Sequence, residues 1–194
     1  MLYTRKGDNG TTKTFACDQR ISKSSIVAEA LGALDEANSF LGLARAKMKD
    51  KTFASPVGLW PREIKGEKIK FSDLILEIQQ NLFIVQAEVA GATLSIDVEK
   101  VKKVEDIVDE IEKVLPPIKT FFISGSTKDG AVLDITRTLV RRAERRVVDV
   151  VEEGKIKVSK ETLAYLNRLS SLLYALARIA SYLEGAEEVK PDYK

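Results

Sequence analysis

The chain has 194 residues, a hydrophobic share of 44% and a formal net charge of +2, because 31 Lys and Arg nearly cancel 29 Asp and Glu. This composition is typical of one globular, soluble domain, and not of a polycation that attracts nucleic acid or an anionic membrane. There is no histidine and a single cysteine, Cys17, which excludes a histidine base, a Ser-His or Cys-His pair, imidazole metal ligands and an intrachain disulfide. Catalysis here must use carboxylates, Arg, Lys, amides, hydroxyls, backbone groups or a bound cofactor.

No apolar run approaches the roughly 18 residues that a membrane span needs, and no cationic and then apolar leader opens the sequence. We therefore expect a cytoplasmic protein with no membrane partner and no nucleic-acid partner.

Residues 1–23 are rich in Gly, Thr and Asp and show no lasting period, which predicts an ordered loop or arm. A helical pattern follows the capping residues Ser24 and Ser25 and runs to about Lys49. Pro and Gly then punctuate residues 52–70, which predicts a long loop or a short hairpin inserted between helices.

Further helical patterns cover residues 72–90, 95–115, 131–153 and 159–183. Ser95 is the expected N-cap of the helix over residues 95–115, and Pro116 ends that helix. Five helices without convincing strand pairs or repeats predict an all-α antiparallel bundle, with residues 1–194 as a single domain.

The arm contains Gly7 and Gly10, which allow backbone N–H groups to turn toward an anion, among Thr, Arg and Lys side chains. The spacing of a Walker A loop is absent. Spacing alone leaves two readings open, a phosphate-binding arm and a mobile polar terminus.

Five arginines and no lysine lie between Arg137 and Arg146, opposite a stripe of valines on the same helix. The guanidinium fork suits phosphate oxygens or a desolvated carboxylate. The alternatives are a solvated, salt-bridged face and, less well supported by the near-neutral chain, a nucleic-acid-binding or scaffold helix.

The last helix is apolar around most of its circumference and is expected to be the most buried one. A polar strip interrupts it at helical spacing, formed by Asn167, Ser171, Tyr174 and Arg178. Such a strip is either a buried hydrogen-bond network or the wall of a ligand site.

The first helix carries a face of small residues, formed by Ala28, Gly32, Asp35, Ser39 and Gly42. Small side chains allow another helix to approach closely. Asp35 in that contact requires a cationic partner, and the arginine helix is the expected supplier.

Three parts of the sequence together resemble the PduO-type ATP:cob(I)alamin adenosyltransferases. They are the arm TRKGDNGTT at 4–12, the string GALDEANS at 32–39, and RTLVRRAERR at 137–146 with YLNRLS at 165–170. The resemblance implies a homotrimer of five-helix bundles with ATP at each subunit interface. It also implies transfer of the 5′-deoxyadenosyl group from ATP to the cobalt of cob(I)alamin, with Mg²⁺ and release of triphosphate.

The resemblance also implies roles for individual residues. The nucleotide would be held by Thr4, Arg5, Lys6, Gly7, Thr12, Lys13, Lys23, Arg141, Arg142, Glu144, Arg145 and Asn167. Arg137 and Asp35 would form a salt bridge between subunits, and Phe122, with Phe121 as its rival, would cover the lower face of the corrin. Arg141, Phe122, Asp35 and Arg137 are therefore the candidate catalytic residues, and no side chain is assigned to a metal.

The sequence departs from the family pattern at 124–126, Asp134 and Ser171, which concern the corrin side more than the ATP side. The partners that the reaction implies are a reductase and a cobalamin-dependent mutase. The alternative function is an ATP-gated cobalamin carrier with little turnover of its own.

Overall fold

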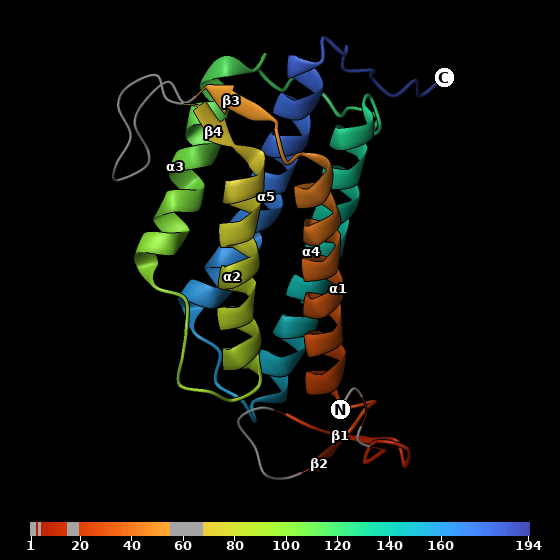
Figure 1. Cartoon of the computed structure of the whole chain (residues 1–194), viewed down its shortest axis with the longest axis vertical. Helices are drawn as coiled ribbons and strands as arrows, with labels where there is room; N and C mark the ends of the chain where they lie inside the picture. Colours follow the sequence, from red (N-terminus) through yellow and green to blue (C-terminus); the bar gives the residue numbers. More distant parts are fainter. Residues whose placement is uncertain (1–2, 4, 15–19, 55–67) are drawn as a thin grey trace.

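The structure, a computed structural model, describes residues 3, 5–14, 20–54 and 68–194, which form five α-helices and four short strands (Figure 1). The helices are α1 Ile26–Lys47, α2 Phe71–Val89, α3 Val98–Val114, α4 Lys128–Glu153 and α5 Lys160–Leu183. The five predicted helices are thus confirmed, although α4 begins three residues before the expected residue 131. None of the helices among the described residues is long and apolar enough to cross a membrane.

Side-chain caps determine where four of the helices begin. In each case the side-chain oxygen accepts a hydrogen bond from the backbone N–H three residues on, and the caps are Ser25, Asp97, Thr127 and Ser159. The expectation that Ser95 caps α3 is wrong. Asp97 accepts from Lys100 N at 2.8 Å and pairs with Lys100 Nζ at 2.6 Å, so both the cap and an ion pair favour this start. These contacts lower the pKa of the Asp97 carboxyl below its ordinary value.

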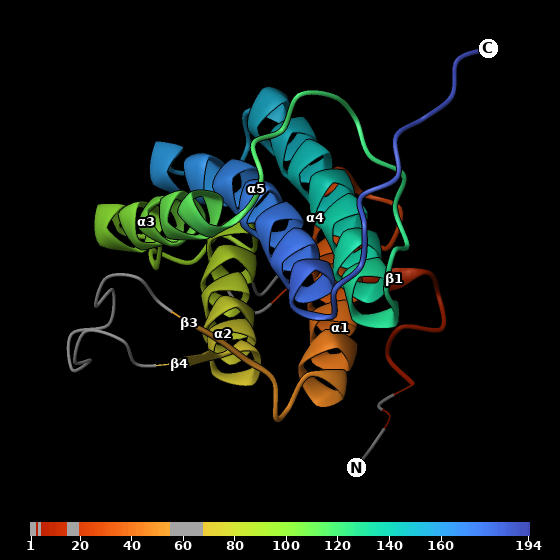
Figure 2. The same cartoon turned by 90° about the horizontal axis from the view of Figure 1, so that it is seen from above.

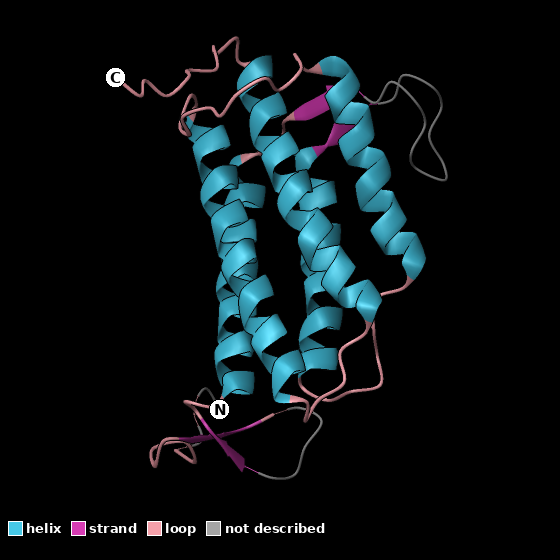
Figure 3. Cartoon of the chain, turned by 180° about the vertical axis from the view of Figure 1, so that it is seen from behind, coloured by secondary structure: helices cyan, strands magenta, loops and turns pink. Residues whose placement is uncertain are grey.

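Two short antiparallel sheets lie at opposite ends of the bundle (Figure 3). The strand β1 Thr11–Lys13 pairs with β2 Arg20–Ser22, and β3 Thr52–Ala54 pairs with β4 Lys68–Lys70. The expectation of no strand pairs is therefore wrong. The ends of the 52–70 insertion do form a hairpin ladder, and residues 55–67 lie outside the described residues.

The helices pack in the order α2, α1, α4, α5, with α3 against α5 (Figure 2). As predicted, α5 is the most buried helix: Leu166, Leu169, Leu172, Leu173 and Leu176 are each 0% exposed. Burying a leucine side chain stabilises a fold by about 1.5–3 kcal/mol, so this helix supplies much of the core's stability.

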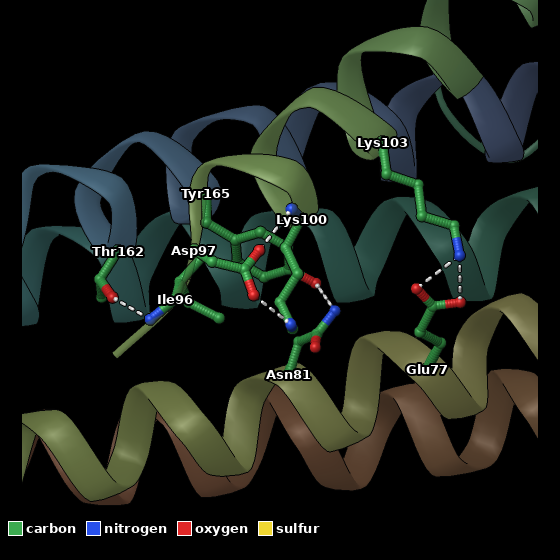
Figure 4. Close-up of polar contacts among 8 residues, drawn as sticks. All are labelled: Glu77, Asn81, Ile96, Asp97, Lys100, Lys103, Thr162 and Tyr165. Carbon is green, nitrogen blue, oxygen red and sulfur yellow. Dashed lines mark hydrogen bonds and ion pairs between the residues drawn. The ribbon is translucent and has the colours of Figure 1, made fainter. Parts of the chain in front are cut away.

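Polar contacts attach α3 and the start of α5 to α2 (Figure 4). Asn81 Nδ2 donates to the buried Tyr165 hydroxyl at 3.2 Å, and Lys103 Nζ pairs with Glu77 on α2 at 2.8 Å. Burial raises the pKa of Tyr165 well above its ordinary value, so the phenol stays neutral and the core holds no phenolate charge.

The carboxylate of Glu88, which is 5% exposed, lies at the amino end of α5. It accepts hydrogen bonds from Ser159 N at 2.7 Å, from Ser159 Oγ at 3.3 Å and from Thr162 Oγ1. The positive end of the helix dipole and these donors compensate the buried charge.

At the other end of the bundle, Lys51 joins three elements. Its Nζ lies 2.6 Å from Asp129 at the start of α4 and 2.6 Å from Glu184 after α5. Gly130 allows the start of α4 to lie against α5, since a Cβ there would meet Ser181 Oγ at 2.3 Å and Ala177 O at 3.1 Å. This end of the molecule therefore has a fixed geometry, and it carries the loop between α3 and α4.

Candidate functional site

A groove with a volume of about 780 Å³ lies between α4, α5 and the loop that precedes α4. We call it the α4–α5 groove. It is lined by Ile118, Lys119, Thr120, Phe121, Phe122, Ser124, Asp134, Arg137, Arg141, Ser170, Ser171 and Tyr174. Three of the four candidate catalytic residues, Phe122, Arg137 and Arg141, thus share one cavity wall.

The two phenylalanines of the loop differ in how they are held. Phe121 is 78% exposed, whereas Phe122 is half-buried with the Arg178 guanidinium 5.5 Å from its ring centroid. A cation over the face of a ring attracts it, and the exposed ring of Phe121 has no such contact among the described residues. Phe122 is therefore the more closely packed of the two apolar side chains.

Arg137 is oriented by two neighbours within the groove. Its Nε donates to Asp134 Oδ1 at 2.6 Å, and its guanidinium lies 5.8 Å from the Tyr174 ring centroid. Burial raises the pKa of the Tyr174 hydroxyl, so that group remains a neutral hydrogen-bond donor. Two residues of the polar strip of α5, Ser171 and Tyr174, thus line the α4–α5 groove. A third, Arg178, instead forms a largely buried ion pair with Glu188.

The other members of the arginine helix contact α1, α5 or their own helix. Arg142 forms an ion pair with Glu36 on α1, and Asn167 Nδ2 donates to Glu144 Oε1 at 3.0 Å. Arg145 Nη1 donates to the carbonyl of Arg141 at 3.1 Å. Of these, Arg141, Arg142 and Arg145 are exposed, so their remaining donors face solvent.

A second groove, of about 620 Å³, lies between the arm, α1 and α2. We call it the α1–α2 groove. It brings together Thr12 and Lys13 from the arm with Gly32 and Asp35 from the small face of α1. The ring of Phe83, which is 63% exposed, completes an apolar wall.

The arm has a defined local structure around its glycines. A Cβ on Gly7 would lie 3.2 Å from Lys23 Nζ, so this glycine allows the Lys23 ammonium to lie against the backbone. Arg5 adopts a left-handed φ of 58° with its guanidinium 5.3 Å from the Tyr3 ring, and Lys6 beside it is exposed. The predicted residue Thr4 lies outside the described residues.

Arg20 is a site-forming residue that the sequence reasoning missed. Its Nε donates to Thr11 Oγ1 at 2.7 Å, and its Nη2 donates to the carbonyls of Lys6 at 2.5 Å and Thr11 at 2.8 Å. The guanidinium fork thereby braces the arm on both sides of Gly7 and Gly10. The sequence could not show this role, because it depends on the pairing of Arg20 with Lys13 across the β1–β2 ladder.

The two grooves lie apart in the chain. The arm is at the end of the bundle where α1 begins, whereas the loop before α4 is at the opposite end (Figure 1). Within the chain Asp35 lies in the α1–α2 groove and Arg137 pairs with Asp134 in the other groove. Within the chain the arginine helix contacts α1 through Glu36 and Glu29, and the pairing of Asp35 with Arg137 between subunits stays a prediction.

Among the residues that the structure describes, no three His, Cys, Asp or Glu side chains lie together in a way that could hold a metal ion. The donors in both grooves are mostly cationic and hydroxylic. This chemistry suits a polyanion bound together with a large, partly apolar ligand.

Comparisons with known proteins agree with this arrangement. The family model for cobalamin adenosyltransferase matches residues 2–180. The corrinoid adenosyltransferase of Bacillus subtilis is 35% identical, with 97% of this chain and 91% of that protein covered. The corrinoid adenosyltransferase PduO of Salmonella typhimurium is 34% identical over 91% of this chain, which spans 48% of that relative's length.

The solved structures include a variant of the PduO-type ATP:corrinoid adenosyltransferase from Lactobacillus reuteri, complexed with cobalamin and ATP. It is 26% identical, covers 100% of this chain and 97% of its own, and superposes with a TM-score of 0.82. The chain belongs to the cobalamin adenosyltransferase family, in its PduO-type branch. It is accordingly an enzyme of the corrinoid adenosyltransferase class.

Proposed function

We propose that this enzyme transfers the 5′-deoxyadenosyl group from ATP to the cobalt of cob(I)alamin, with inorganic triphosphate as the second product. The observation that supports this most is the composition of the α4–α5 groove. It brings the half-buried Phe122 together with Arg137 and Arg141 in the lining of one groove. An apolar wall suits the face of a corrin, and paired arginines suit a triphosphate.

The residues present fit chemistry in which the substrate supplies the nucleophile. Cobalt(I) donates an electron pair to the ribose C5′, the C5′–O bond breaks, and the triphosphate leaves with the electron pair of that bond. No protein base is required, in agreement with a chain that has no histidine. Arg141 and its neighbours would orient the triphosphate and stabilise its growing charge. Mg²⁺ keeps several waters and binds substrate phosphates, so we propose that it enters with ATP.

Phe122 would occupy the lower face of the corrin and keep the nucleotide base of cobalamin from coordinating the metal. Loss of that axial ligand makes the reduction of cob(II)alamin easier. Phe122 rather than Phe121 fits this role, because the Phe122 ring packs against the Arg178 guanidinium while Phe121 is 78% exposed.

We further propose that residues 1–194 act as one adenosyltransferase domain and that the active unit is a homotrimer. The arm of one subunit, residues 1–23, would meet the arginine helix of the next, which joins the two grooves into one site. The exposed small face around Asp35 and Gly32 supports this, because a Cβ on Gly32 would meet no atom of the described residues within 4 Å. Asp35 would then pair with Arg137 of the neighbouring subunit.

An anaerobic turnover assay with ATP, Mg²⁺ and chemically reduced cobalamin tests the reaction. We expect many turnovers of the cobalt–carbon product and an equal amount of triphosphate. Arg141→Ala should lose ATP binding with its helix content unchanged, and Arg146→Ala on the same helix is the matched control. A single turnover that stops until an acceptor enzyme removes the product would favour the cobalamin carrier instead.

Mixing of two inactive variants tests whether each site is shared between subunits. Lys13→Ala removes an arm group and Arg141→Ala removes a helix group. After the two proteins are unfolded and refolded together, about one interface in four should combine an intact arm with an intact helix and regain activity. Activity that never returns on mixing would place the complete site within one chain.

A further inference from the structure

The chain beyond α5 returns to the loop between α3 and α4 and lies alongside it (Figure 2). Gly185 reverses the chain with a φ of 72°, which favours glycine. Ile123 N then donates to the carbonyl of Val189 at 2.8 Å, and Ser126 Oγ donates to the carbonyl of Glu187 at 3.3 Å. The C-terminal segment thus holds the loop that carries Phe122.

The side chain of Glu188, in this segment, contacts Arg178 on α5. Its carboxylate accepts from Arg178 Nε at 2.5 Å and from Arg178 Nη2 at 3.0 Å, a two-point pair that fixes the plane of the guanidinium. Arg178 is only 7% exposed, so its charge depends on this partner.

The guanidinium of Arg178 in turn contacts the loop between α3 and α4 at two points. Its Nη2 donates to the carbonyl of Pro116 at 2.9 Å, where the loop begins, and its guanidinium lies 5.5 Å from the Phe122 ring centroid. The ring of Phe122 therefore packs on a cation whose position is set by a residue sixty-six positions further along the chain.

We propose that Glu188 is a positioning residue for the corrin side of the site, which acts through Arg178 to hold the Phe122 ring in place. This inference rests on the proposed role of Phe122 under the corrin. Without the carboxylate, Arg178 keeps the carbonyl of Pro116 as its acceptor among the described residues, and its guanidinium turns toward water. The Phe122 ring then loses its contact with the Arg178 guanidinium, and the loop loses the contact that holds Phe122 in the lining of the α4–α5 groove.

Two variants and a matched control test the inference. Glu188→Gln keeps the shape but removes the charge, and Glu188→Ala removes both. Glu187→Gln makes the same chemical change on the adjacent exposed residue, which uses only its backbone carbonyl to bind the loop. The first measurement is amide hydrogen exchange of the loop in the ligand-free protein, read at Ile123, whose N–H donates to the carbonyl of Val189. Both Glu188 variants should exchange there at least tenfold faster than wild type, and Glu187→Gln should match wild type.

The second measurement is the electron paramagnetic resonance spectrum of cob(II)alamin bound with ATP, in which an axial base nitrogen splits the cobalt lines. Wild type and Glu187→Gln should lose this splitting, and Glu188→Gln should retain it in most of the bound cofactor. The kcat measured from cob(II)alamin with a reductant should fall about tenfold in Glu188→Gln, with the KM for ATP unchanged.

The outcomes separate the two proposals. Splitting that persists in wild type would overturn the proposed role of Phe122, while the exchange measurement would still test the hold of Glu188 on the loop. Splitting lost equally in wild type and Glu188→Gln would overturn the positioning role, whether or not the loop exchanges faster.

Discussion

Replacement of Arg20 by alanine tests whether the arm must be preformed to bind ATP. The guanidinium makes three hydrogen bonds within the arm, to Thr11 Oγ1 at 2.7 Å, to the Lys6 carbonyl at 2.5 Å and to the Thr11 carbonyl at 2.8 Å. Without these hydrogen bonds, the arm of Arg20→Ala is free to leave the conformation in which Gly7 lies against Lys23. Part of the binding free energy of ATP is then used to order the arm again.

The expected size of this effect follows from the exposure of the contacts. A hydrogen bond contributes about 0.5–1.5 kcal/mol net, and exposed pairs lie at the low end. Three such bonds around the exposed Arg20 give about 1–2 kcal/mol, which corresponds to an increase of about 5- to 30-fold in the Kd for ATP. The melting temperature without ATP should stay close to that of wild type, because Arg20 lies outside the buried core.

Isothermal titration calorimetry with ATP and Mg²⁺ measures this change, with Arg20→Lys as the control that keeps the charge but loses the fork. Arg20→Lys should recover only a small part of the affinity, since an ammonium cannot reach all three acceptors at once. An unchanged Kd in Arg20→Ala would show that the arm is organised by ATP itself, and the bracing role would be refuted.

Three further predictions concern stability. Glu88→Ala should lower the free energy of unfolding in urea by about 3 kcal/mol, because three donors at the start of α5 lose a buried acceptor; a loss as small as that of an exposed glutamate would contradict this explanation. The two carboxylates beside Lys51 raise its pKa above 10.5. The difference in unfolding free energy between wild type and Lys51→Gln should therefore be constant from about pH 7 to 9 and disappear as the pH rises through the raised pKa. A difference that persists at high pH would rule out the ion pairs. Gly130→Ala should lower the melting temperature through its contact with Ser181, and the double variant with Ser181→Ala should recover part of the loss; equal destabilisation in both would exclude that contact.

The helices could be predicted from the sequence because each buries a periodic apolar face of several turns. The capping residues placed most helix starts within a few positions, and the leucines of α5 identified the most buried helix. The two sheets could not be predicted in this way, since a strand of three residues has too few positions to show alternation. The strands β3 and β4 are brought together by the ends of α1 and α2, which they follow and precede in the chain.

The candidate site shows a similar limit. Helical spacing correctly grouped Ser171 with Tyr174 on a cavity wall, because the two residues share one face of a single element. It could not decide which of two adjacent acidic residues of α1 faces the arginine helix. Glu36 does so and Asp35 does not, because neighbouring residues of a helix point about 100° apart and the choice depends on the packing of α1 between α2 and α4.

The ladder between β3 and β4 has a practical consequence for engineering. Ala54 and Lys68 are register partners, so the two positions that flank residues 55–67 lie side by side. The ring of Phe53 packs on that of Phe71 at 4.9 Å, which anchors this point to the first turn of α2. A tag, a fluorophore carrier or a two-residue turn could therefore replace residues 55–67 with no change in the distance that the remaining chain must span. The protein thus offers an attachment point for immobilisation at the end of the bundle opposite its N-terminal arm.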